Sequence, residues 1–67
     1  MPVYYANKNA QSVGEHIVHQ EGCYRMPDLH NRLYLGYFLN ANQAVRKAGK
    51  LFDKVNACYF CSRKAHK

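Results

Sequence analysis

Two pairs of possible metal ligands stand out in the 67-residue sequence. Cys58 and Cys61 are separated by two residues, a spacing that lets both thiolates reach one tetrahedral ion. Upstream, three residues separate His19 from Cys23, and 34 residues lie between Cys23 and Cys58. A set of three cysteines and one histidine is a common complement for structural zinc. The sequence therefore predicts one zinc site with the ligands His19, Cys23, Cys58 and Cys61.

The identity of the fourth ligand stays open among the histidines. His19 ranks first because it precedes a cysteine across a glycine turn. His66 ranks second because it follows Cys61 on the same C-terminal segment. His16 ranks third, since on an extended strand it would point to the face opposite His19. For His16 and His30 we expect an imidazole that faces solvent.

Other chemistry for the cysteines is disfavoured by their context. A thioredoxin-type pair precedes a helix in a βαβ unit, whereas Cys58 and Cys61 follow the expected helix. Nucleophilic catalysis by Cys23 with His19 lacks a third group that would orient the histidine. The sequence has no glycine-rich phosphate loop and no carboxylate pair. We therefore expect no enzyme, and the alternative for the thiols is free cysteines or a local disulfide without a metal.

The charge distribution favours an anionic partner. Ten Lys and Arg against four Asp and Glu give a net charge of +6, with −1 on residues 1–31 and +7 on residues 32–67. This asymmetry favours a polyanion, although basic residues can also serve only to keep a small protein soluble. We expect nucleic acid, bound without sequence specificity. The candidate contacts are the ring of Tyr59 and six basic side chains: Arg46, Lys47, Lys50, Lys54, Arg63 and Lys64.

Two further functions remain as alternatives. The first is a structural or protein-interaction module that meets its partner through an exposed strand edge or a tyrosine patch. The second is a metal or redox sensor with reactive thiols. Tyr59 and Phe60, between the two cysteines, are candidates to stack on bases in the manner of a zinc knuckle, and the alternative for both rings is to cover the metal and fill the core. We expect no small-molecule substrate, because so short a chain cannot easily form a cleft of several hundred cubic ångströms.

Length explains why a metal would be needed. Ordering the chain costs about 1.5 kcal/mol per residue, roughly 100 kcal/mol in all, which apolar burial barely offsets in a single domain of this size. An odd number of cysteines disfavours a scaffold built only from disulfides. No apolar run approaches the length of a membrane span, and the first residues do not form a signal peptide. We expect a cytoplasmic protein whose thiols are reduced.

The elements that would position the ligands begin with a β-hairpin. Residues 3–5 and 15–19 are rich in strand-forming side chains, and a polar segment lies between them. Residues 33–39 carry apolar side chains at positions of both faces, which predicts the central and most buried strand. Gly36 within that segment predicts a bulge or a close approach of another part of the backbone.

One helix follows the third strand. Asn40 is a favourable N-cap, and Gln43 three residues later completes a capping box. Apolar residues recur at helical spacing beyond this point, and we expect the helix to end near Lys54. The sequence thus predicts the α+β class: one small domain over residues 1–67, with a two- or three-stranded antiparallel sheet, one main helix and a zinc knuckle.

Two families share part of this pattern. In chain order the shared residues are Val18-His19-x3-Cys23, Asn31-Arg32-x-Tyr34, Phe38, Ala44, Ala48-Gly49 and Cys58-x2-Cys61. This order resembles the small zinc-bearing domain of the Ada type and covers about residues 17–61. The methyl-accepting chemistry of the Ada repair proteins is not implied, because it depends on a four-cysteine site and this sequence has three cysteines.

The second likeness covers nearly the whole chain. Its frame reads Asn9-Ala10-Gln11, Gly14, His16, Val18-His19, Gly22-Cys23, Tyr34-Leu35-Gly36, Ala44-Val45, Ala48 and Cys58-Tyr59-x-Cys61. This frame resembles a family of small bacterial zinc-binding proteins to which no activity is assigned. Both resemblances imply the same four ligands: His19, Cys23, Cys58 and Cys61.

Overall fold

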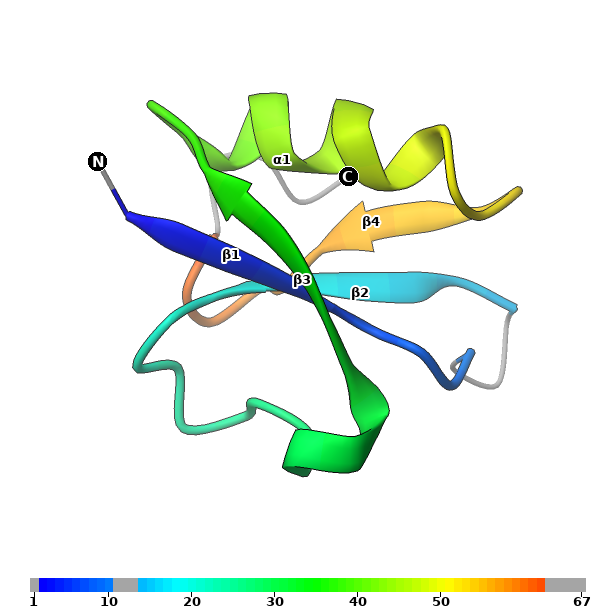
Figure 1. Ribbon diagram of the computed structural model, residues 1–67, viewed down its shortest axis with the longest axis horizontal. Coiled ribbons are helices and arrows are strands. Elements are labelled where there is room, and N and C mark those ends of the chain that lie inside the picture. Colours follow the sequence, from blue (N-terminus) through cyan, green and yellow to red (C-terminus); the bar gives the residue numbers. More distant parts are fainter. Residues whose placement is uncertain (1, 11–13, 63–67) are drawn as a thin grey trace.

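The computed structural model describes residues 2–10 and 14–62, in which one helix packs against one face of a mixed β-sheet (Figure 1). The elements in chain order are β1 (Val3–Asn7), β2 (His16–Gln20), the short 3-10 turn η1 (Leu29–Asn31), β3 (Arg32–Tyr37), α1 (Ala41–Gly49) and β4 (Val55–Ala57). The α+β class predicted from the sequence is confirmed. In the described part of the chain no helix has the length and apolar character needed to cross a bilayer.

The sheet contains one strand more than expected. Its order is β3-β1-β2-β4, in which β1 is antiparallel to both of its neighbours and β4 is parallel to β2. The expectation of two or three antiparallel strands is therefore wrong in number and in direction. The missed strand, β4, is only three residues long and includes a polar residue, Asn56. It exists because it pairs with β2, which local sequence cannot reveal.

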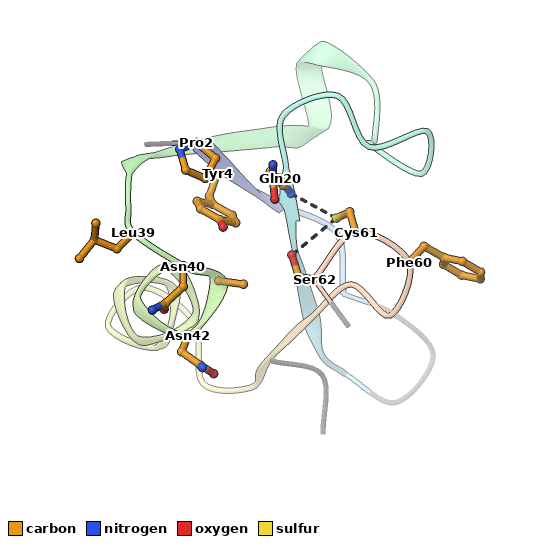
Figure 2. Close-up of a pocket in the computed structure, with 10 residues that line it drawn as sticks. Pro2, Tyr4, Gln20, Leu39, Asn40, Asn42, Phe60, Cys61 and Ser62 are labelled. Carbon is orange, nitrogen blue, oxygen red and sulfur yellow. Dashed lines mark hydrogen bonds between the residues drawn. The ribbon is translucent and has the colours of Figure 1, made fainter. Parts of the chain in front are cut away.

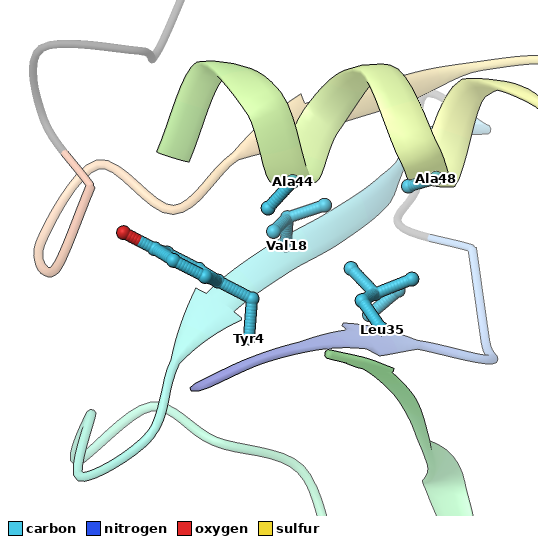
Figure 3. Packing of buried hydrophobic residues seen from close by; sticks show 6 residues of the cluster. Tyr4, Val18, Leu35, Ala44 and Ala48 are labelled. Carbon is cyan, nitrogen blue, oxygen red and sulfur yellow. The ribbon is translucent and has the colours of Figure 1, made fainter. Parts of the chain in front are cut away.

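The core is small and contains many alanines. Tyr4, Val18 and Leu35 project from the sheet toward α1 (Figure 3). The helix contributes Ala44 and Ala48, and both are completely buried. The side chain of alanine is only a methyl group, so α1 can lie close to the strands. Such a core buries few large side chains, which fits a chain that needs another source of stability.

The strand expected at the centre lies instead at the edge. In β3 only Leu35 is buried, while Tyr34 and Tyr37 are exposed. Tyrosine satisfies an apolar pattern and also tolerates solvent at its hydroxyl end, so the pattern does not distinguish an edge strand from a central one. The predicted bulge is confirmed, because Tyr4 pairs with Gly36 and Tyr5 with Tyr34, which leaves Leu35 as the additional residue. Gly36 has φ +121°, a conformation that favours glycine.

The helix begins as expected and ends earlier. Asn40 caps it, since the Gln43 N–H donates to Asn40 Oδ1 at 3.1 Å. It ends at Gly49, so Lys54, near which the sequence predicts the helix end, lies beyond the helix. Glycine weakens the last turn, and the next residues leave the helix so that Phe52 stacks on His16, with 3.8 Å between ring centroids.

Candidate metal centre

Four side chains from distant parts of the sequence meet at one point. One ligand atom from each of His19, Cys23, Cys58 and Cys61 lies within 4.8 Å of all the others. His19 and Cys58 are 4% exposed, while Cys23 and Cys61 are half-buried. A cluster of three thiols and an imidazole at these separations can hold a metal ion. These are the four ligands that the sequence predicts.

The parallel pairing of β2 with β4 places His19 beside Cys58. Val18 and Ala57 are register partners, and both are fully buried. His19 follows Val18 on β2 and Cys58 follows Ala57 directly beyond β4, so the two side chains leave adjacent points of the paired strands. The Cys58 N–H donates to the Val18 carbonyl at 2.9 Å, which fixes this neighbourhood.

Two consecutive turns place Cys23. The first runs from Gln20 to Cys23 and is closed by the Cys23 N–H, which donates to the Gln20 carbonyl at 3.1 Å. Gly22, third in this turn, has φ +93°, as a type II turn requires. The second turn is closed by the Met26 N–H on the Cys23 carbonyl at 3.0 Å. Within it, the Arg25 N–H donates to Cys23 Sγ at 3.4 Å.

A third turn carries Cys61 and is joined to the end of β2. The Ser62 N–H donates to the Cys58 carbonyl at 2.9 Å and closes the turn. Cys61 Sγ accepts from the Gln20 N–H at 3.3 Å and lies 3.6 Å from Ser62 Oγ (Figure 2). Backbone N–H groups therefore point at the sulfurs from both sides of the cluster. Such bonds stabilise thiolates, which are the metal-binding form of cysteine.

The pKa values of the ligands respond to this crowding. Burial and the adjacent Cys61 and Cys58 thiols raise the pKa of Cys23 to about 12, against the opposing Arg25 N–H. Burial also raises the pKa of Cys58, but the N–H groups of Cys61 and Phe60 and the neighbouring thiols outweigh it, so the net shift is downward. The cluster thus ionises readily at one sulfur and reluctantly at another. A divalent cation would remove this conflict by neutralising the charge among the sulfurs.

The imidazole of His19 is suited to ligation. Burial, and then the positive charge of Arg25, lower the pKa of His19, which keeps the ring neutral. Its Nδ1 is buried and has no hydrogen-bond partner among the described residues. A buried nitrogen without a partner costs about 1–3 kcal/mol. A metal ion bound among the four side chains would give this ring the polar partner that the described residues do not supply.

The other histidines do not join the cluster. His16 stacks on Phe52, and its Nδ1 lies 2.9 Å from the Asn7 carbonyl oxygen. His30 lies in η1 and is exposed. His66, the second-ranked candidate, lies outside the described residues. The structure therefore brings His19, the histidine ranked first as the fourth ligand, to the three cysteines.

The expected nucleic-acid contacts are spread over different surfaces. Arg46, Lys47 and Lys50 are exposed on or just after α1, and Lys54 is exposed beyond the end of the helix. Tyr59 is 50% exposed in the turn between the ligands Cys58 and Cys61. Arg63 and Lys64 lie outside the described residues.

Tyr24 and Arg25 complete the surface of the site and were not anticipated from the sequence. They are the two residues after Cys23, and this position beside a candidate ligand is the sequence signal that points to them. Tyr24 meets Phe60 at 5.7 Å between ring centroids, and the Arg25 guanidinium lies 4.3 Å from the Phe60 ring centroid. The two ligand-bearing turns thus touch through these three side chains.

A pocket adjoins the cluster. It has a volume of about 600 Å³, is open to solvent, and lies between the N-terminal end of α1 and the Cys61 turn (Figure 2). Tyr4, Gln20 and Asn40 contribute to its lining. The pocket is an open hollow on the surface rather than an enclosed cleft, so the expectation of no small-molecule substrate stays a prediction.

Fold and site together define a small α+β domain with a cluster of one histidine and three cysteines positioned to hold a metal ion. In comparisons with known proteins, no family model, no curated protein and no solved structure matches this chain.

Proposed function

We propose that the protein is a small zinc-stapled module that binds nucleic acid without sequence specificity. The observation that carries the zinc assignment is the convergence of four ligand atoms within 4.8 Å. Three thiols and one imidazole match the preference of zinc for sulfur and nitrogen ligands. Four protein ligands fill a tetrahedral shell and leave no open position for a substrate, so the role of the metal is structural.

The sulfur spacing fits a tetrahedral ion of the size of zinc. Two thiolates bound at about 2.3 Å to a tetrahedral ion lie about 3.8 Å apart. Cys23 Sγ and Cys58 Sγ are separated by 3.8 Å. The same distance is too long for a disulfide, whose sulfur–sulfur bond is about 2.05 Å. The two cysteines are therefore already spaced as ligands of one ion.

Metal content tests the zinc assignment directly. Native mass spectrometry of the protein purified without added metal is expected to show one zinc ion per chain. Reconstitution with Co²⁺ is expected to give the absorption of a tetrahedral, sulfur-rich site. Cys58→Ser and His19→Ala should lose both signals, while His30→Ala, which changes an exposed histidine, should keep them. Retention of the cobalt spectrum by both ligand variants would refute the assignment.

Charge supports nucleic acid as the partner. The chain carries +6, and a zinc ion held by three thiolates and one neutral imidazole would change this only to about +5. Arg46, Lys47 and Lys50 are exposed and near one another in sequence on α1 and its C-cap. Binding through such side chains releases counterions and weakens steeply as salt increases.

A salt titration tests this partner. The affinity for nucleic acid is measured at several salt concentrations for the wild type and for a variant with Arg46, Lys47 and Lys50 changed to Gln. Each phosphate contact contributes about 0.7 to the logarithmic slope on a single strand, so the variant should lose up to about 2 from that slope. Binding that does not change with salt would refute the proposal.

A protein-interaction module is the second candidate, and the position of β3 favours it. β3 is an edge strand, so its outer backbone groups are available for pairing with another strand. Tyr34 and Tyr37 on this strand are 55% and 62% exposed. A stoichiometric protein partner that survives nuclease treatment and is lost in a Tyr34→Ser, Tyr37→Ser variant would favour this candidate over nucleic acid.

A further inference from the structure

The two ligand-bearing turns form a continuous aromatic surface, the knuckle cluster, which consists of Tyr24, Arg25, Tyr59 and Phe60. The Phe60 ring contacts Tyr24 at 5.7 Å and Tyr59 at 5.5 Å between centroids, in both cases edge to face. The Arg25 guanidinium lies 4.3 Å from the Phe60 centroid and 5.9 Å from that of Tyr24. Three rings and one cation thus form a single surface unit.

The knuckle cluster faces solvent rather than the core. Tyr24 is 78% exposed, and Phe60 and Tyr59 are about half exposed. The Phe60 ring extends outward, away from α1 (Figure 2), although Phe60 also contributes to the lining of the pocket. In the described part of the chain, the buried core cluster and the side chains packed against it include none of the three rings. The rings therefore contribute little core volume, although the sequence allowed that role for Phe60 and Tyr59. Exposed aromatic side chains that gather in this way mark binding sites.

We propose that the knuckle cluster is a stacking platform for single-stranded nucleic acid, an inference that rests on the proposed function and deepens it. Aromatic faces stack on unpaired bases of any sequence, because every base presents a flat π-surface. In a duplex the bases are already stacked on each other and do not reach these rings. The charge of Arg25, held over Phe60, lies where it can meet the phosphate next to a stacked base.

The location of the cluster makes binding depend on the metal. Tyr24 and Arg25 follow the ligand Cys23, and Phe60 lies between the ligands Cys58 and Cys61. These two turns are far apart in the sequence and meet at the proposed metal site. Apart from contacts among the four ligand side chains, the Gln20 N–H, which donates to Cys61 Sγ, joins the end of β2 to the Cys61 turn. Removal of the metal should therefore separate the rings and abolish stacking.

Charge favours nucleic acid over a protein as the occupant. An apolar protein surface would gain little from a guanidinium at the centre of the patch, whereas a phosphate pairs with it. The net charge of +6 attracts a polyanion and would repel a basic protein. Phe60 lines the pocket at the N-terminal end of α1, whereas Arg46 and Lys47 lie in the last turn of the helix and Lys50 is its C-cap. The two surfaces can therefore be tested separately.

Fluorescence anisotropy tests the inference. Zinc-loaded protein is titrated into a labelled single-stranded oligonucleotide of about 12 nucleotides and into a duplex of the same length. The variant Tyr24→Ala, Phe60→Ala removes two rings and should weaken single-strand binding by at least about fivefold. Duplex binding should stay unchanged. Tyr37→Ala is the matched control, because this equally exposed ring lies on β3, and β1 separates that strand from β2.

Further variants keep the inference testable if Tyr24→Ala, Phe60→Ala does not fold. Tyr24→Leu, Phe60→Leu keeps apolar volume and removes the flat rings, and it should also lose single-strand affinity while keeping its zinc. Arg25→Lys keeps the charge without the planar guanidinium and should lose less than Arg25→Gln. Zinc content and the far-UV circular dichroism spectrum of each variant establish that the fold is intact.

The outcomes separate this inference from the proposed function. Preference for the single strand, loss in both ring variants and no loss in Tyr37→Ala support it. Wild-type affinity in the ring variants, with a loss only when Arg46, Lys47 and Lys50 are changed, overturns the inference and keeps nucleic acid as the partner. No binding to either oligonucleotide at low salt overturns both and leaves the cluster to a protein partner.

Discussion

Removal of the metal should unfold this protein. Only three of the six residues in the buried core cluster, Tyr4, Val18 and Leu35, are larger than alanine. At about 1.5–3 kcal/mol for each large side chain, their complete burial contributes roughly 5–9 kcal/mol. Structural zinc in small domains contributes about 10–16 kcal/mol of apparent binding energy, and a whole domain has a net stability of about 5–15 kcal/mol. Loss of the larger contribution leaves the folded state unfavourable.

Chelation monitored by circular dichroism measures this effect. The zinc-loaded protein is expected to show a cooperative thermal transition, whereas the chelated protein should show the spectrum of an unfolded chain at all temperatures. One equivalent of zinc should restore the transition. Cys58→Ser removes one thiolate at nearly constant volume and should give the same result as chelation. His30→Ala is the control, because that histidine is exposed in η1 and should melt like the wild type.

One result would refute the reasoning. If the chelated protein, with no zinc by mass spectrometry, keeps a cooperative transition within a few degrees of the zinc-loaded form, the core is sufficient by itself. In that case the four ligand residues lie together for another reason, and the thiols become candidates for the sensor role.

Three further predictions concern the scaffold around the site, each measured by urea unfolding of the zinc-loaded protein. Gly22→Ala should cost about 1–3 kcal/mol, because φ is +93° and no atom lies within 4 Å of the added Cβ, so strain alone acts; an unchanged midpoint would contradict this. Asn40→Ala should cost about 1 kcal/mol by removing the acceptor for the Gln43 N–H, and Asn40→Asp should restore it. Val18→Ala should cost about 2–3 kcal/mol, since that side chain is completely buried under α1, whereas a cost below 0.5 kcal/mol (about the size of a surface change) would show a loose core.

The features that local sequence encodes were predicted well. The helix start follows from the Asn40 cap, which depends only on residues three positions apart. The bulge at Gly36 follows from a glycine inside a strand-forming segment. The clustering of the ligands follows from residue types and spacing, because few other arrangements explain a Cys-x2-Cys pair in so small a chain. In each case the determining contacts are close in sequence or belong to a known set of ligand types.

The features that depend on tertiary pairing were missed. The alternation in residues 33–39 shows that the segment is a strand but not whether a neighbour covers both of its edges, so β3 was placed at the centre instead of at the edge. The helix end was misjudged because Phe52 fits the helical spacing, yet its ring stacks on His16 from outside the helix. Both errors arise where an apolar residue has two possible places to be buried.

The missed strand β4 is also the element that positions the buried cysteine. Its three residues have little strand tendency of their own, and its pairing with β2 sets Cys58 beside His19. If the metal binds these two ligands, it holds together the ends of the two strands, and the paired strands in turn hold the ligands at the correct spacing. Strand and metal would then stabilise each other. The local sequence pattern predicts the ligands, but the pairing of β2 with β4 exists only in the folded chain.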